Sequence, residues 1–342
     1  MVFGKFSILL LHLILNGIFG LSDGCLAHPY SYVSNRFSVK LYDKLGTSQS
    51  SSNVFFSPLS ISAALGMLEL GARGNTKTQI DIALETENAV DIHENISRVL
   101  EDTNNSNNNF TLQIVNRLFG EQGFSFNSTY LADSTTFYGE PLERHDFANS
   151  PEESRVEINK WIKERTEDTI KDIFQPGDIT DSSILALVSA VYFKGNWASP
   201  FDKRQTRKRP FYTANPRPTL VDMMTQTGRF RYAHSETWQA SMIEIPYYGT
   251  ASMLIILPDQ RDGLGYFESE FTIDEFDRLR RSMQGTRVSL SLPGFVLENM
   301  RIDLKEPLKS LGMTDLFSSN ADLSGIGGTP GELQLSKSTH RV

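Results

Sequence analysis

The chain has 342 residues, of which 39% are hydrophobic and 22% are charged, so it is long enough to bury a large core. This composition excludes an intrinsically disordered protein and a membrane channel. The net charge of −8 argues against a general affinity for nucleic acid, so no nucleic-acid partner is expected.

The N-terminus predicts a secretory signal peptide. Lys5 precedes an apolar run from residue 6 to residue 21, and the small residues Gly24 and Ala27 follow, which is the layout of a secretory leader. A buried amphipathic helix is the alternative, but the run does not separate an apolar face from a polar one. We therefore expect residues 1–27 to be a signal peptide and residues 28–342 to form a single secreted, extracellular domain.

The same run is a poor candidate for a membrane span. It contains His12 and Asn16, and it is shorter than the roughly 20 apolar residues that a spanning helix needs. No membrane partner is therefore expected. Cleavage after Ala27 would also remove Cys25, the only cysteine, so the mature chain would have no disulfide and would depend on its core for stability.

Two helices are predicted next along the chain. Ser57 is a capping residue followed by Pro58 at the first helical position, and the apolar residues that follow lie on nearly every face up to residues 71–74. Such a helix must be central and buried. A second helical stretch begins at Thr76 and continues to Leu84.

The pattern Asn-x-Ser/Thr, which accepts N-linked glycans, occurs at Asn95, Asn104, Asn109 and Asn127. A polar loop from residue 104 to residue 109 would produce some of these triplets without any glycan. In company with the signal peptide, however, the pattern predicts glycosylation at one or more of the four.

Strands are predicted mainly in the later part of the chain. Residues 111–118 alternate in polarity, and residues 184–193 form a continuous apolar run that should be buried on both faces. Residues 252–257 and 287–292 follow as strands, and Ser150–Pro151 begins a helix. Early helices and later strands predict an α+β domain.

The sequence shows none of the common catalytic patterns. It lacks His-Glu-x-x-His, Gly-x-Ser-x-Gly and a Walker glycine loop, and a single cysteine cannot form a metal cluster. We expect no metal and no cofactor. The basic run from Lys203 to Arg209 could bind a polyanion, but a solvated loop is favoured because the run is short and the chain is acidic.

Several segments, taken in their order and spacing, resemble the serpin family. They are Asn53–Ile61, Leu112–Phe119, Ile158–Trp161, Leu187–Trp197, Met223–Phe230, Glu244–Tyr247, Leu257–Pro258 and Leu292–Phe295. The resemblance extends from about residue 37 to residue 342. It implies a monomer with the serpin fold, one domain of three β-sheets and about eight or nine helices.

The resemblance also implies a mechanism. A long exposed loop acts as bait for a serine (or cysteine) protease, and the cut loop inserts as a new strand into the largest sheet, carrying the acyl-linked protease with it. Such an inhibitor is consumed rather than turned over. The protein is therefore not expected to be an enzyme.

Five residues match family positions that take part in the opening of this sheet. Ser57, Ser60, Ser189 and His340 match a central hydrogen-bonded cluster, and Trp197 matches the region where insertion begins. The family usually has Asn at the position of Ser189, and the shorter side chain predicts a looser network. The alternative interpretation is that the four polar residues are an ordinary helix cap and surface groups, and that Trp197 is a core aromatic.

The sequence stops soon after His340, where the family continues into its bait loop and last strands. From the resemblance we expect the reactive bond and the C-terminal strands to be absent from these residues, and the chain as written not to inhibit by loop insertion. The alternative function is a non-inhibitory serpin that binds or carries another molecule. Heparin is not expected as a partner, because residues 93–109, where such a site often lies in the family, are acidic and carry several glycan acceptors.

Overall fold

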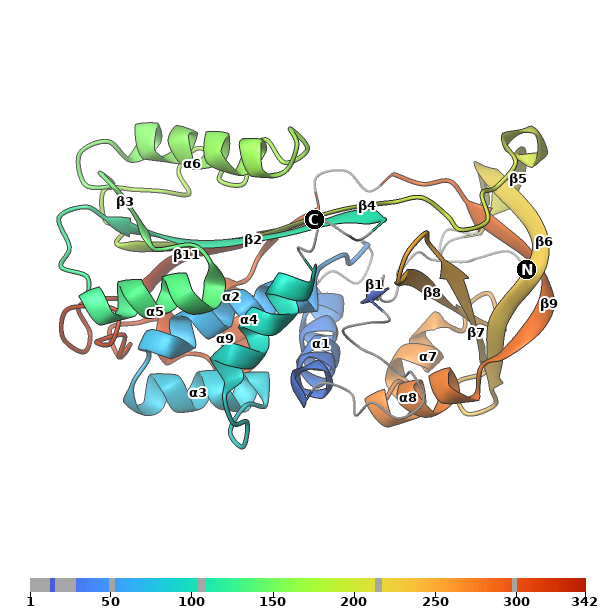
Figure 1. The fold of residues 1–342 in the computed structure, drawn as a ribbon, viewed down its shortest axis with the longest axis horizontal. Helices are drawn as coiled ribbons and strands as arrows, with labels where there is room; N and C mark the ends of the chain where they lie inside the picture. Colours follow the sequence, from blue (N-terminus) through green and yellow to red (C-terminus); the bar gives the residue numbers. More distant parts are fainter. Residues whose placement is uncertain (1–12, 16–28, 49–52, 104–108, 213–216, 297–299) are drawn as a thin grey trace.

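The computed structural model describes residues 13–15, 29–48, 53–103, 109–212, 217–296 and 300–342 (Figure 1). The predicted signal peptide lies outside these residues, apart from strand β1 (Leu13–Leu15), which pairs with β8 (Ala251–Pro258). Within the described part of the chain, no helix has both the length and the apolar character needed to cross a membrane.

The first sheet has five strands in the order β10-β11-β4-β2-β3. Their bounds are Arg301–Asp303, Leu335–Arg341, Leu185–Gly195, Phe110–Glu121 and Glu143–His145. The central strand β4 is antiparallel to β2 but parallel to β11. The junction between β4 and β11 is therefore a parallel contact between strands that are far apart in the sequence.

The second sheet has six strands, β1, β8, β7, β6 and β5 in that order, with β9 also paired to β6. The bounds not yet given are β5 (Arg207–Phe211), β6 (Thr219–Ser235), β7 (Ala240–Pro246) and β9 (Gln284–Pro293). The 17-residue strand β6 pairs with β5 through its first residues, with β9 through its middle and with β7 through its last residues. One long strand thus joins two groups of strands, so the described residues contain two hydrogen-bonded sheets where the family resemblance implied three.

Nine α-helices surround these sheets in the described residues, in agreement with the predicted α+β class. They are α1 (Pro29–Ser48), α2 (Pro58–Gly71), α3 (Gly74–Leu84), α4 (Ile92–Thr103), α5 (Ser128–Tyr138), α6 (Pro151–Arg165), α7 (Leu264–Glu270), α8 (Ile273–Ser282) and α9 (Lys305–Ser310). Figure 1 shows α6 on one side of the five-stranded sheet and α2, with α3–α5, on the other. Two short 3₁₀ helices, η1 (Lys203–Gln205) and η2 (Asp315–Phe317), complete the structure.

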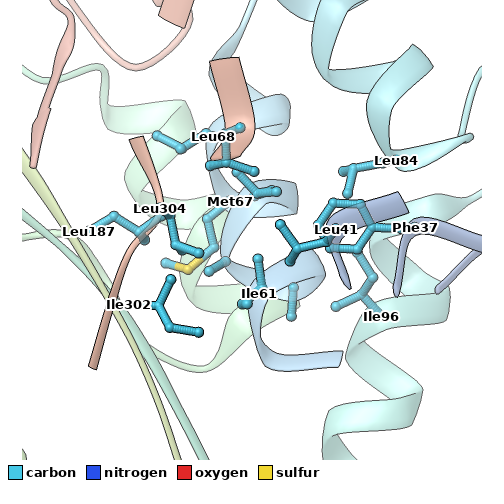
Figure 2. Packing of buried hydrophobic residues seen from close by; sticks show 14 of the residues in the cluster. Phe37, Leu41, Ile61, Met67, Leu68, Leu84, Ile96, Leu187, Ile302 and Leu304 are labelled. Atoms are coloured by element: carbon cyan, nitrogen blue, oxygen red, sulfur yellow. The ribbon is translucent and has the colours of Figure 1, made fainter. Parts of the chain in front are cut away.

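Helix α2 is the central, buried helix that the sequence predicted. The Ser57 hydroxyl accepts a hydrogen bond from the Ser60 backbone N–H, and Pro58 occupies the first turn, where its missing N–H is not needed. Figure 2 shows Ile61, Met67 and Leu68 of α2 among side chains from α1, α4 and the five-stranded sheet. The helix is thus packed on all sides rather than along one stripe.

The opposite face of the sheet packs against α6. Val188 and Ala190 of β4 and Phe119 of β2 share a buried cluster with Ile158 and Ile162 of α6. Because side chains alternate along a strand, the intervening residues of β4 point toward α2. This two-sided burial of β4 was predicted from its continuous apolar run, and it is complete from Leu185 to Val191.

Candidate functional site at the β4–β11 junction

The predicted cluster residues come together where the five-stranded sheet meets the start of α2. His340 of β11 lies directly opposite Ser189 of β4, and Ser189 lies directly opposite Asn116 of β2. Directly opposite residues project from the same face of a sheet. The three side chains therefore form one row across three strands, facing Ser57 and Ser60.

A continuous set of hydrogen bonds connects this row to α2. The Ser57 backbone N–H donates to His340 Nε2 at 2.9 Å, and His340 Nδ1 lies 2.9 Å from the Ser189 hydroxyl oxygen. That oxygen is also 2.9 Å from the Ser60 hydroxyl oxygen. Ser60 Oγ donates to Asn116 Oδ1 at 2.9 Å, and Asn116 Nδ2 donates back to the Ser60 carbonyl at 3.0 Å.

These contacts determine the direction of every donor. His340 Nε2 accepts from a backbone N–H, so in the neutral ring the hydrogen is on Nδ1 and is donated to Ser189. The Ser60 hydroxyl hydrogen is directed to Asn116, so Ser189 must donate to Ser60. The Ser60 and Ser189 hydroxyls thus each accept one hydrogen bond from a side chain and donate one.

The cluster is removed from water. His340, Ser189 and Ser60 are fully buried, and Asn116 is almost so. Burial lowers the pKa of His340 from its ordinary value of 6.5 to about 3, and a backbone hydrogen bond with Ser189 acts in the opposite direction. The imidazole is therefore neutral at physiological pH, as the direction of the donors requires. The interpretation of His340 as a surface residue is wrong.

Asn116 is the member of the cluster that the sequence analysis did not assign. It supplies the amide that Ser189 lacks, because β2 brings it next to Ser189 on the neighbouring strand. Ser189 is hydrogen-bonded to both His340 and Ser60 in this arrangement. Asn116 lies within the predicted strand of residues 111–118, but Gln113 and Arg117 of that strand are polar as well, so its polarity does not single it out. Its partner depends on strand register, which the sequence does not display.

Trp197 lies apart from the cluster. It follows the end of β4, roughly 25 Å along the chain from Ser189 at the usual strand rise. Its ring stacks on Tyr247 with 4.3 Å between ring centroids, and its edge contacts Phe201. It is half-buried where the chain passes from the five-stranded to the six-stranded sheet, and an isolated bridge pairs it with Tyr247.

The basic run was expected to be a solvated loop, but the structure places it in η1 and the edge strand β5. Its side chains at Lys203, Arg204, Arg207, Lys208 and Arg209 are all exposed. Among the described residues, no three His, Cys, Asp or Glu side chains gather as a metal ion would require.

The chain is similar to a known protein family and to solved structures. Residues 32–342 match the family model for Serpin (serine protease inhibitor). Human Serpin B3 is 38% identical over 91% of this chain and 84% of its own length, and the leukocyte elastase inhibitor of the horse is 37% identical with the same coverage. The crystal structure of uncleaved ovalbumin superposes with a TM-score of 0.86 at 28% identity, over 91% of this chain and 87% of that one.

Proposed function

The chain belongs to the serpin family, and from that premise we propose that the protein is a secreted inhibitor of a serine protease that acts by accepting a new strand between β4 and β11. The observation that carries this proposal is the buried hydrogen-bonded cluster that joins these two strands to each other and to α2. Relatives whose names state an inhibitory function, such as the leukocyte elastase inhibitor, support it.

The strand directions favour insertion at this junction. A strand entering between β4 and β11 can run antiparallel to both, because the two are parallel to each other. Insertion would replace one parallel ladder with two antiparallel ladders, and a parallel ladder is slightly less stable per residue. The same is not true at the β4–β2 contact, where an inserted strand would be parallel to one neighbour.

The cluster is suited to this separation because, within it, only the hydrogen bonds of His340 connect β11 to the other members. Parting β11 from β4 breaks both hydrogen bonds of His340, to Ser189 and to the Ser57 backbone N–H, at a net cost of about 1 kcal/mol each. Ser60, Asn116 and Ser189 stay bonded to one another on the other side. Interdigitated apolar side chains at the same place would separate only by opening a cavity, which costs more.

In this proposal the protease cleaves a bait loop and becomes joined to it as an acyl ester through its catalytic serine. Insertion of the cut loop at the β4–β11 junction then displaces and distorts the protease before water hydrolyses the ester. The inhibitor is consumed in the process. The bait residues determine the target protease, whereas the cluster would take part in strand insertion in the same way with any target protease.

We also propose secretion and glycosylation. The predicted signal peptide at residues 1–27 supports secretion. Asn109 and Asn127 are exposed, and Asn127 caps α5 through its Oδ1 atom, which leaves the Nδ2 atom available to a glycan. Asn95 Nδ2 instead donates to the Val90 carbonyl, so a glycan there would break a bond, and Asn104 lies outside the described residues.

The test mixes the native protein with a panel of serine proteases. An SDS-stable adduct with at least one protease is expected. In parallel, the 342-residue chain is incubated with a synthetic peptide of about 12 alternating small residues, enough to cover β4 at the usual rise per residue. Hydrogen exchange should then slow along β4 and β11. Plain substrate cleavage of the native protein, together with no change in exchange, would refute the proposal.

A further inference from the structure

Two consecutive hydroxyl groups of β11 are buried without a hydrogen-bond partner among the described residues. Ser338 and Thr339 are both fully buried, yet neither Ser338 Oγ nor Thr339 Oγ1 is hydrogen-bonded within the described part of the chain. The hydroxyl of Ser336 in the same strand, by contrast, accepts a hydrogen bond from the Ile184 N–H at 3.2 Å. A buried hydroxyl that lacks a partner costs free energy, so the two at this junction need a physical reason.

The surroundings of Ser338 are apolar. It lies directly opposite Leu187 of β4, and it faces α2, because His340 two residues further along the strand does so. The Leu304 backbone N–H donates to the Ser338 carbonyl from the other side of β11. Figure 2 shows Leu187 and Leu304 near Met67 of α2, in one buried cluster. None of these side chains offers the Ser338 hydroxyl a strong acceptor or a donor.

The surroundings of Thr339 leave its hydroxyl unpaired on the α6 side. Thr339 lies directly opposite Val188 of β4 and Asp303 of β10. The Val188 side chain is apolar and belongs to the cluster beneath α6. The Asp303 carboxylate already accepts from the Lys305 backbone N–H at 3.0 Å and from Lys337 Nζ at 2.6 Å. The two unpaired hydroxyls thus lie on opposite faces of β11, and the neighbouring residues of β4 can pair with neither.

A strand inserted between β4 and β11 would give both hydroxyls new neighbours. If it runs antiparallel to β11, it places one residue opposite His340, the next opposite Thr339 and the next opposite Ser338. Directly opposite side chains have Cβ atoms about 4.5–5.5 Å apart, and pairs of Thr or Ser at such positions form hydrogen bonds across the two strands. The incoming strand can therefore supply the partners that β4 lacks.

We propose that Ser338 and Thr339 select an inserting strand that carries two consecutive threonines, placed directly after the residue that meets His340. This selectivity rests on the insertion proposed above and adds a requirement for the chemistry of the inserting strand. Each of the two incoming residues lies between a hydroxyl of β11 and an apolar side chain of β4, Leu187 or Val188. Threonine suits both neighbours, because its hydroxyl pairs with β11 and its methyl group packs against β4. It also favours the strand conformation.

The experiment measures the affinity of the 342-residue chain for fluorescent peptides of about 12 small residues, enough to cover β4. A Thr–Thr pair is placed at successive positions along the peptide to find the register, and each peptide has an isosteric Val–Val counterpart. At the best position the Thr–Thr peptide should bind about tenfold more tightly than its counterpart. The variant Ser338→Ala/Thr339→Val should reverse this preference, because the peptide hydroxyls are then buried without a partner.

The matched control is Thr103→Val/Ser134→Ala, which replaces two buried hydroxyls that donate to carbonyls within α4 and α5. This control should keep the preference for Thr–Thr. Thermal unfolding supplies a readout that does not depend on the peptides. The thermal midpoint of Ser338→Ala/Thr339→Val should equal or exceed that of the parent chain, because neither hydroxyl has a hydrogen bond to lose.

The outcomes distinguish this selectivity from insertion itself. If neither kind of peptide binds, both strand insertion at this junction and the selectivity are refuted. If the Thr–Thr and Val–Val peptides bind equally well, or if the preference persists in Ser338→Ala/Thr339→Val, the selectivity is wrong and insertion stands. A lower thermal midpoint of that variant would also overturn the selectivity, because it would mean that the two hydroxyls already have partners.

Discussion

The buried, neutral imidazole of His340 predicts that acid destabilises the protein through this one group. In the unfolded chain the histidine has an ordinary pKa near 6.5, whereas in the folded chain burial lowers it to about 3. The unfolded state therefore binds a proton at a pH where the folded state does not. The stability from this group is complete above pH 6.5 and is lost as the pH falls toward 3.

The size of the effect follows from the two pKa values. At pH 5 the solution is about 1.5 pH units below the unfolded-state pKa of His340, and the folded state is still unprotonated there. At 1.4 kcal/mol per unit, protonation therefore stabilises the unfolded state by about 2 kcal/mol relative to the folded state between pH 7 and pH 5. His340→Asn provides the comparison, because an amide can donate toward Ser189 and accept from Ser57 but does not titrate.

The assay is urea unfolding at pH 7 and pH 5, followed by tryptophan fluorescence. Carboxylates and other histidines contribute equally to both proteins, so the difference between them isolates His340. The parent chain should lose about 2 kcal/mol more than His340→Asn between the two pH values. Equal losses would refute the reasoning, because they would mean that His340 is not a buried neutral group.

Two substitutions test the cluster and a third tests the opposite end of α2. Asn116→Ala removes both hydrogen bonds to Ser60 and should lower the free energy of urea unfolding by about 2–3 kcal/mol, and a loss below about 1 kcal/mol would contradict the network described here. Ser57→Ala removes the cap of α2 and should cost about 1 kcal/mol in thermal unfolding, whereas Ser57→Thr, which keeps the hydroxyl, should cost less. Gly71→Ala would place a Cβ 2.9 Å from the Ile326 backbone nitrogen and should destabilise by about 1–3 kcal/mol in the same assay, and a neutral result would mean that the turn at Ile326 moves easily.

Local signals in the sequence were sufficient to predict the elements whose structure depends on residues nearby in the chain. Ser57 and Pro58 located the start of α2, because a cap and an N-terminal proline act within one turn. The apolar run of β4 predicted burial on both faces for the same reason. The edge strand β5 was missed, since a run of basic residues has no strand pattern and its backbone pairing with β6 is a contact that the sequence does not display.

Contacts between distant strands could not be predicted from such local signals. The row formed by Asn116, Ser189 and His340 depends on the register of β2 against β4 and of β4 against β11, and a shift of one residue would turn each side chain to the other face. The family resemblance supplied Ser189 and His340 but not Asn116. Arg229 and Arg287 are 58 positions apart in the sequence, and only the β6–β9 pairing makes them neighbours.

The β4–β11 junction is restrained from both faces, and the restraints differ in kind. On the α2 side, His340 is held by two hydrogen bonds in a buried, uncharged network. On the α6 side, Arg341 donates to the Asp172 carbonyl at 2.8 Å and Lys337 is bound to Asp178 at 3.1 Å, both in the segment between α6 and β4.

Because neighbouring residues of β11 point to opposite faces, the strand cannot move away from β4 without loosening the contacts on both the α2 side and the α6 side. The buried set is insensitive to salt, whereas ion pairs at partly exposed positions weaken as salt rises. Opening of the sheet should therefore respond to ionic strength through the segment that follows α6, and to acid through His340.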